Sequence, residues 1–263
     1  MTKRLALIGY PVSHTLSPAI HGAAIRELGL DLTYEAVETT PERLPAFMDE
    51  LRGPDWLGCN VSVPHKEAVL PFMAELSGEA RAIGAVNTIL NGDGRMQGYN
   101  TDAAGFLHDV QEHFGPVQGK RVVVLGAGGA ARAVCYELAS KAERVWVLNR
   151  TSARAEALVL ELAGTLQVGS PEHLRECQLI VNCTSAGLHA GDSPLPDELV
   201  PRSVQLYDLI YNPAETRLMK AVKQRGGKAV NGLGMLVRQA AAAFQIWTGI
   251  EPPLSVMFEA VHA

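Results

Sequence analysis

The chain has 263 residues, of which 47% are hydrophobic, and a formal net charge of −5. That length allows one large domain or two modest domains with substantial cores. The negative charge removes the electrostatic reason to expect nucleic-acid binding, which needs a basic face. No apolar stretch is long enough to suggest a membrane span.

The first residues and the cysteines indicate the compartment. A positive tip is followed by an apolar run, but Gly9 and Pro11 interrupt it before it reaches the length of a signal-peptide core. The four cysteines form no C-x-x-C pair, which argues against a zinc site and a redox dithiol. They are typical of buried thiols in a reducing compartment. We therefore expect a cytoplasmic protein without a metal site.

Short β-rich runs alternate with helical patterns along most of the chain. Strands are expected at residues 5–9, 32–37, 57–63, 122–125, 145–148, 179–183 and 206–209, and helices at 20–28, 44–51 and 153–162. This alternation predicts βαβ units and mostly parallel sheets. Residues 91–121 hold a turn-rich break, a helix and a lead into a new strand, so we expect two sheets. Two further helical patterns, 234–247 and 253–263, end the chain and should pack on an earlier domain.

A glycine-rich turn lies between an expected strand and an expected helix at residues 121–139. Gly126, Gly128 and Ala131 have the G-x-G-x-x-A spacing of dinucleotide-binding proteins. The first glycine permits the tight turn, and the second lets the backbone approach a pyrophosphate at the helix N-terminus. A tight turn without a ligand is the alternative.

The stretch NRTSAR follows the next strand, where an NAD-binding protein carries an acidic residue for the ribose hydroxyls. Arg150 and Arg154 lie here instead, with the Thr151 hydroxyl between them. These donors suit a dianionic 2′-phosphate, which favours NADP(H) over NAD(H). The alternative is a solvated helix start, although cations are disfavoured at that end of a helix.

Three polar clusters lie outside the nucleotide unit. In the first, Ser17 precedes Pro18, so we expect Ser17 to be an N-cap with proline at the first helical position. Free N–H groups there, with the hydroxyls of Thr15 and Ser17, suit a carboxylate ligand. Simple helix capping explains the same residues.

The second cluster is NVSVPHK, where Asn60 and Ser62 alternate with valines and so face one side of a strand. Lys66 is expected in the first turn of a following helix, where the dipole disfavours its charge and makes it a better proton donor. A surface lysine is the alternative. The third cluster contains Asn87 and Asp102, and Asp102 is expected to open a helix, where its anion is stabilised.

Nine stretches in order resemble the shikimate dehydrogenase family over nearly the whole chain: SHTLSP, NVSVPHK, GAVNT, YNTDAAGF, GAGGAARAV, NRT, NCTSAG, YDLIYNP and NGLGMLVRQAA. The resemblance implies reversible NADPH-dependent reduction of 3-dehydroshikimate to shikimate, a step of aromatic amino-acid biosynthesis. It implies a two-domain α/β fold, with a Rossmann-type NADP-binding domain at 102–235, a discontinuous substrate domain at 1–101 and 236–263, and an active site in the cleft between them. The partner would then be a small-molecule substrate, and the protein would be a monomer or a homodimer.

The resemblance also implies site residues. Lys66 and Asp102 would be the catalytic pair. The substrate contacts would be Thr15, Ser17, Asn60, Ser62, Asn87, Tyr211 and Gln239. The cofactor contacts would be Gly126, Ala127, Gly128, Gly129, Ala130, Asn149, Arg150, Thr151, Arg154, Thr184, Leu209, Gly232 and Met235. Thr15 stands where the family usually has serine and Ser62 where it usually has threonine, and both keep the hydroxyl.

Two other functions fit the same sequence. A quinate/shikimate dehydrogenase with relaxed cofactor choice would turn over quinate and NAD comparably, and the arginine cluster argues against it. A binding or regulatory protein could keep the dinucleotide fold without chemistry. Such a protein would be expected to have lost Lys66 or Asp102, and both are present.

Overall fold

The computed structural model describes residues 2–189 and 191–261, which divide into two compact units. Unit 1 comprises residues up to Gly105 together with those from Leu236 onward, and unit 2 comprises Phe106–Met235. The helices that begin at Asp102 and Leu233 each continue from one unit into the other. Each unit is built on one six-stranded sheet, which confirms the expectation of two sheets.

The sheet of unit 1 has the strand order β2-β1-β3-β5-β6-β4. The strands are β1 (Lys3–Gly9), β2 (Leu32–Glu38), β3 (Trp56–Val61), β4 (Glu75–Leu76), β5 (Thr88–Gly92) and β6 (Arg95–Tyr99). Only β5 runs against the others, because it pairs antiparallel with both β3 and β6. The sheet is therefore mostly parallel, as predicted.

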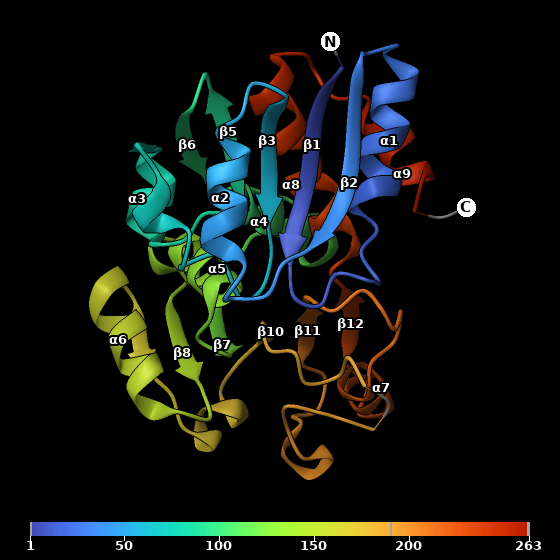
Figure 1. The fold of residues 1–263 in the computed structure, drawn as a ribbon. Coiled ribbons are helices and arrows are strands. Elements are labelled where there is room, and N and C mark those ends of the chain that lie inside the picture. Colours follow the sequence, from blue (N-terminus) through green and yellow to red (C-terminus); the bar gives the residue numbers. More distant parts are fainter. Residues whose placement is uncertain (1, 190, 262–263) are drawn as a thin grey trace. The chain divides into compact units, whose positions relative to one another are not determined.

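Helices cover both faces of this sheet (Figure 1). They are α1 (Ser17–Glu27), α2 (Leu44–Leu51), α3 (Gly78–Ile83), α8 (Leu233–Thr248) and α9 (Leu254–Glu259), with a short 3₁₀ turn, η1, at Leu70–Phe72. The helix α4 (Asp102–Phe114) begins in unit 1, and its apolar residues pack in the core of unit 2. Apolar residues of α2 pack with Ala6, Ile8 and Cys59 on one face. On the other side α1, α8 and α9 share a cluster that includes Ile20 and Phe244. The C-terminal helices thus pack on the start of the chain, as expected; residues 262–263 of that expected helix lie outside the described residues.

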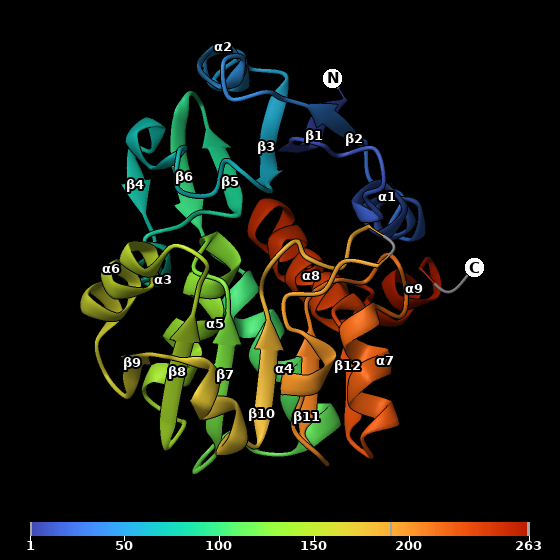
Figure 2. The same ribbon diagram turned by 90° about the horizontal axis from the view of Figure 1, so that it is seen from below.

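The sheet of unit 2 is wholly parallel, with the order β12-β11-β10-β7-β8-β9 (Figure 2). The strands are β7 (Arg121–Leu125), β8 (Arg144–Leu148), β9 (Leu166–Val168), β10 (Leu179–Asn182), β11 (Gln205–Asp208) and β12 (Lys228–Asn231). Counted from β7, this is the order 3-2-1-4-5-6, in which the crossover direction reverses between β7 and β10. Such a reversal opens a crevice at the carboxyl ends of the strands.

Alternation along the strands builds the two cores of unit 2. Val122 and Val124 of β7 face a cluster that includes α4 and α5 (Gly129–Ala139) and α6 (Ser152–Leu162). Val123 and Leu125 face the opposite cluster, which includes α7 (Arg217–Gln224). Short 3₁₀ turns lie at Pro171–Arg175 (η2) and Asp197–Leu199 (η3). In unit 2, every apolar run that was predicted to be a strand forms one, because its alternate residues are buried on the two faces of the sheet.

One expectation about the sheets was wrong, and three short strands were not anticipated. The turn-rich stretch after residue 91 is not a simple break, since β5 and β6 form a hairpin across it. Asp93 (φ 52°) and Gly94 (φ 85°) supply the two positive φ angles of a tight hairpin turn. The short strands β4, β9 and β12 were also not anticipated, because they lie at sheet edges and contribute few apolar residues.

The cysteines are free thiols, and Cys59, Cys135 and Cys177 are buried as expected, whereas Cys183 is only half-buried. Burial raises the pKa of the Cys177 thiol to about 12, so this sulfur stays protonated and unreactive. Among the described residues, no helix has the length and apolar character to cross a membrane. The described residues also contain no group of three or more histidine, cysteine, aspartate or glutamate side chains that could hold a metal ion.

Candidate functional site

An ion pair between Lys66 and Asp102 is the centre of the polar cluster in unit 1. The Lys66 Nζ donates to Asp102 Oδ2 at 2.6 Å, and the side chains are 14% and 6% exposed. Asp102 opens α4, as predicted, and its backbone N–H donates to Asn100 Oδ1. A largely desolvated ammonium beside a carboxylate can hold and deliver a proton.

Lys66 does not lie in a helix, contrary to the sequence prediction. Residues 62–69 form turns between β3 and η1, because Pro64 ends the strand and the chain then folds back through His65 and Val69. The dipole argument made for this lysine therefore does not apply. The Asp102 carboxylate, rather than a helix end, defines the electrostatic surroundings of Lys66.

Asn87 ties the carboxylate to the rest of the cluster. Its Nδ2 lies 3.0 Å from Asp102 Oδ1, 2.9 Å from Thr101 Oγ1 and 3.3 Å from Gln239 Oε1. Its Oδ1 accepts from the Thr101 backbone N–H at 2.8 Å. The predicted residues Asn87, Asp102 and Gln239 are thus brought together although 152 positions separate the first from the last.

Asn60 joins the same cluster from β3. Its Nδ2 donates to the main-chain oxygen of Asn87 at 3.2 Å and to Thr88 Oγ1 at 3.1 Å. Its Oδ1 accepts from the Tyr34 hydroxyl at 2.7 Å. Sequence reasoning missed Tyr34, since nothing in the pattern of an edge strand distinguishes an inward tyrosine from an ordinary packing residue.

The hydroxyl cluster near α1 differs from its prediction in one respect. Leu16, not Ser17, is the N-cap residue, and Ser17 is already the first residue of α1. The Thr15 hydroxyl accepts from the Ser17 backbone N–H at 3.2 Å and donates to Ser17 Oγ at the same distance, so Thr15 satisfies the N–H of the first helical residue. Ser62 lies just beyond β3, half-buried, with its backbone N–H donating to Ile8.

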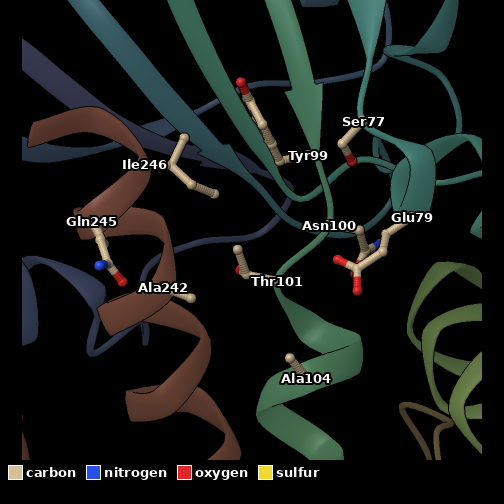
Figure 3. Close-up of a pocket in the computed structure, with 9 residues that line it drawn as sticks. All are labelled: Ser77, Glu79, Tyr99, Asn100, Thr101, Ala104, Ala242, Gln245 and Ile246. Atoms are coloured by element: carbon tan, nitrogen blue, oxygen red, sulfur yellow. The ribbon is translucent and has the colours of Figure 1, made fainter. Parts of the chain in front are cut away.

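A pocket of about 330 Å³ lies on unit 1 beside this cluster. Figure 3 shows α8 on one side and the start of α4 on the other, with the end of β6 above. Its walls are Ser77, Glu79, Tyr99, Asn100, Thr101, Ala104, Ala242, Gln245 and Ile246. The pocket meets the polar cluster through Asn100, which accepts from the Asp102 N–H, and through Thr101, which bonds with Asn87. None of the predicted site residues lines it.

In unit 2 the glycine-rich turn between β7 and α5 has the geometry of a phosphate-binding loop. Gly126 has φ +107°, and a side chain there would meet Thr184 and the main chain of Cys183 at 3.2–3.3 Å. Gly128 is the N-cap of α5 and makes no side-chain cap, and a Cβ on it would face open space. The residues 126–130 therefore leave a helix N-terminus accessible to a pyrophosphate, as a bound dinucleotide requires.

The arginine cluster lies past the carboxyl end of β8. Asn149 Nδ2 donates to the main-chain oxygen of Thr151 at 2.9 Å, which shapes the turn. Thr151 is the N-cap residue of α6, but its hydroxyl caps no backbone N–H. Arg150, Thr151 and Arg154 are exposed, so their donors can reach a 2′-phosphate.

The remaining predicted cofactor residues follow β10, β11 and β12. Thr184 donates from its backbone N–H and hydroxyl to Asn182 Oδ1, and Leu209 donates its N–H to Asn182 O. A Cβ on Gly232 would come within 2.3 Å of Leu209 O, so only glycine permits this approach. Met235 is buried in the cluster shared with α4. Tyr211, predicted to contact substrate, lies in unit 2 after β11 and is half-buried.

A buried carboxylate that sequence reasoning missed organises these loops. Asp208 Oδ1 accepts from Asn182 Nδ2 at 2.9 Å and from the Ile210 N–H, while Oδ2 accepts from Thr216 Oγ1 at 2.7 Å. Burial raises the pKa of Asp208 above its ordinary value, and these hydrogen bonds oppose that shift. The aspartate thereby holds together the loops that carry Thr184 and Leu209.

A parallel sheet with a glycine-rich phosphate loop, joined to a unit with a lysine–carboxylate pair among amides and hydroxyls, defines a dinucleotide-dependent oxidoreductase of polar substrates. Comparison with known proteins gives the family. Matching family models are described as the shikimate dehydrogenase substrate binding domain (residues 7–89), shikimate/quinate 5-dehydrogenase (108–190) and the shikimate 5′-dehydrogenase C-terminal domain (232–262). The chain belongs to the shikimate dehydrogenase family.

Individual relatives match over almost their full length. A shikimate dehydrogenase (NADP(+)) of Thermus thermophilus is 45% identical, over 98% of this chain and 97% of its own. A crystal structure of shikimate 5-dehydrogenase from Thermus thermophilus with NADP(H) and shikimate superposes with a TM-score of 0.90, at 44% identity, covering 99% and 98% of the two chains. Quinate dehydrogenase of Corynebacterium glutamicum with NAD has a TM-score of 0.88 at 29% identity, covering 99% of both chains.

Proposed function

We propose that this protein is an NADP-dependent shikimate dehydrogenase, which reversibly reduces 3-dehydroshikimate to shikimate in aromatic amino-acid biosynthesis. The observation that carries the proposal is the Lys66–Asp102 pair at 2.6 Å, which is linked through Asn87 to Asn60 and Gln239. Carbonyl reduction needs a proton donor beside the ketone, and a polyhydroxylated acid needs several neutral donors and acceptors. Membership of the shikimate dehydrogenase family supports the same activity.

We carry the substrate contacts over from the motifs shared with the family, and the chemistry of the side chains supports them. Thr15 and Ser17 bind the substrate carboxylate with their hydroxyls, close to the start of α1. The ring and its hydroxyls are contacted by Asn60, Ser62, Asn87, Tyr211 and Gln239. The two amide hydrogens of Asn87 already face three protein acceptors, on Thr101, Asp102 and Gln239, so a substrate oxygen that accepts from Asn87 takes the place of one of them.

The cofactor is held by unit 2. Residues 126–130 bind the pyrophosphate at the start of α5, and Asn149, Arg150, Thr151 and Arg154 bind the adenosine ribose and its 2′-phosphate. The loops carrying Thr184, Leu209, Gly232 and Met235 border the nicotinamide. The bound nicotinamide supplies or accepts the hydride.

Protons are handled by residues of unit 1. The Lys66 ammonium donates a proton to the oxygen that was the ketone as negative charge develops on it, and takes the proton back in the oxidative direction. Asp102 holds the lysine in position through the 2.6 Å ion pair and accepts from a substrate hydroxyl.

The domain division follows from these roles. Residues 1–101 and 236–263 form the substrate-binding and catalytic domain, and residues 102–235 form the NADP-binding domain. The free thiols of Cys59, Cys135 and Cys177 support a reducing, cytoplasmic location. We propose a monomer or homodimer, which light scattering at several concentrations distinguishes.

The experiment that tests the proposal is steady-state oxidation of shikimate and of quinate, each with NADP⁺ and NAD⁺. Shikimate with NADP⁺ is expected to exceed every other pairing in kcat/KM by about a hundredfold, which is about 2.7 kcal/mol of transition-state discrimination. Comparable rates with quinate or NAD⁺ would favour a quinate/shikimate dehydrogenase. A quinate dehydrogenase of Corynebacterium glutamicum with NAD is among the structures that this chain resembles. Absence of turnover with all four pairings would favour a regulator without chemistry.

A further inference from the structure

A continuous chain of hydrogen bonds, buried except for the first, which is partly buried, joins strand β2 to the ion pair. It runs through Tyr34, Asn60, Thr88, Asn87 and Asp102, in that order. The donor–acceptor distances along it are 2.7, 3.1, 3.0 and 3.0 Å. Sheet register brings the middle of this chain together, because Asn60 and Thr88 lie directly opposite on β3 and β5.

The orientation of the Asn60 amide is determined by its surroundings. The main-chain oxygen of Asn87 can only accept, so the Asn60 Nδ2 must face it, at 3.2 Å. The Oδ1 then faces Tyr34, whose hydroxyl donates. Both amide hydrogens and one oxygen lone pair of Asn60 are thereby used inside the protein.

The orientation of the Asn87 amide follows in the same way. The Thr101 backbone N–H can only donate, so Asn87 Oδ1 faces it at 2.8 Å, and Nδ2 is turned toward Asp102. Each donor from Tyr34 onward therefore points toward the Asp102 carboxylate. Hydrogen bonds aligned in one direction polarise one another, so the last bond depends on the first.

Tyr34 is held at the start of the chain by aromatic packing. Its ring stacks on His21 with centroids 4.2 Å apart and planes 16° apart, and Trp247 lies 6.2 Å away. His21 is fully buried, and neither ring nitrogen has a hydrogen-bond partner among the described residues. Burial raises the pKa of the Tyr34 hydroxyl well above its ordinary value, so the hydroxyl remains a donor.

We infer that Tyr34 is a positioning residue for the reaction: through Asn60, Thr88 and Asn87 it fixes the Asp102 carboxylate against Lys66. Tyr34 touches neither reacting atom. Its role rests on the proposed function, since it acts on the pair that handles the proton. Without its hydroxyl, the Asn60 oxygen loses its donor, and the amides behind Asp102 lose their fixed orientation.

The first test is Tyr34→Phe, which keeps the ring on His21 and removes only the hydroxyl. Oxidation of shikimate is expected to lose about tenfold in kcat, the effect of one hydrogen bond, with an unchanged KM for NADP⁺. The melting temperature should also fall, because Asn60 Oδ1 loses its donor, so kcat is compared well below that temperature. The matched control is Tyr99→Phe, because Tyr99 is also half-buried in unit 1 and donates its hydroxyl to Gln97 at 2.8 Å, outside the chain. Equal losses in both variants, or none in either, would overturn the inference.

The second test asks whether Tyr34 acts through its neighbours. In a double-mutant cycle, Tyr34→Phe should cost less than about twofold when Asn60→Ala is already present, whereas independent effects would multiply. If Asn60→Ala does not fold, Thr88→Val interrupts the same chain with little change in volume. Multiplied losses in the cycle mean that Tyr34 acts by another route and contradict the inference.

A readout without turnover separates this inference from the proposed function. The Nδ2 amide NMR signals of Asn60 and Asn87 should shift in Tyr34→Phe and stay in place in Tyr99→Phe. An inactive wild type whose signals behave this way would refute the proposed activity but leave the positioning chain. An active wild type, with Asn87 signals and kcat both unaffected by Tyr34→Phe, would refute the positioning role alone.

Discussion

The Lys66 ammonium and the Asp102 carboxylate, 36 positions apart in the chain, meet at 2.6 Å within unit 1. Both side chains are largely removed from water, and Asp102 has a second partner in Asn87. An exposed ion pair of this kind would contribute little. Here the pair lies among amide and hydroxyl groups suited to a polyhydroxylated substrate, which favours a role in catalysis over a role in stability.

The first prediction concerns Lys66. Lys66→Met keeps the apolar stem and removes the proton donor, so kcat for shikimate oxidation should fall by about two to four orders of magnitude, with little change in the KM for NADP⁺. The control is Lys141→Met, since Lys141 also forms an ion pair, with Glu137 at 2.7 Å. Near-normal kcat in Lys66→Met would remove the lysine from the mechanism.

The second prediction concerns the cofactor phosphate. Arg150→Ala and Arg154→Ala should each raise the KM for NADP⁺ about tenfold or more, the scale of one charge-assisted hydrogen bond, and leave the KM for NAD⁺ nearly unchanged. Arg144→Ala is the control, because Arg144 is exposed at the opposite end of the same strand, β8. An equal effect on both cofactors would mean that the arginines do not bind the 2′-phosphate.

The third prediction concerns Gly58 on β3. A Cβ there would lie 2.1 Å from the main-chain oxygen of Ile89 and 2.6 Å from Trp247 Nε1, which donates to that same oxygen at 2.9 Å. Gly58→Ala should therefore lower the free energy of unfolding by about 3 kcal/mol, at the upper end of overpacking effects. The measurement is urea unfolding.

Gly78→Ala is the matched control for Gly58. A Cβ on Gly78 meets nothing within 4 Å, and the residue begins α3. Alanine there should be neutral or slightly stabilising. If the two alanine variants unfold at the same urea concentration, the close approach of Trp247 to β3 and β5 does not limit stability.

The fourth prediction is a pH dependence of stability. Burial lowers the pKa of His21 to about 3, against an unfolded value of 6.5. Between these values the unfolded chain binds a proton that the folded chain does not, so stability is lost as the pH falls from 6.5 toward 3. The interval sets an upper limit of about 5 kcal/mol on this loss.

His21→Leu removes the titrating ring at similar volume, so the difference in unfolding free energy between pH 7 and pH 4 should become smaller than in the wild type. His108→Gln is the control, since His108 is exposed on α4. Chemical denaturation at a series of pH values gives the comparison. A wild-type slope that persists in His21→Leu would assign the acid sensitivity to other groups.

The sequence alone determined the local elements and the chemistry of the motifs. Apolar alternation located the long strands, and the spacing of Gly126 and Gly128 located the turn before α5. The residue types at 66 and 102 indicated a proton donor beside a carboxylate. These features depend on neighbours within one turn or one strand, where steric preference and periodicity act directly.

Local reasoning failed at three places where the chain adopts a different local arrangement from the one expected. Ser17 was expected to cap α1, but Thr15 lies in the position to accept its N–H. Lys66 was expected to enter a helix, but the chain after Pro64 turns instead. The hairpin of β5 and β6 was read as a break because its two strands are short and polar.

Only the tertiary structure decided which polar residues act together. Tyr34, Asn60, Thr88 and Asp102 come from four separate elements, and no spacing in the sequence relates them. The register of β3 against β5 places Asn60 opposite Thr88, and packing of α1 and α8 places His21 and Trp247 around Tyr34. A hydrogen bond requires partners about 3 Å apart with the right orientation, and that distance is set by how sheets and helices pack rather than by the order of residues in the chain.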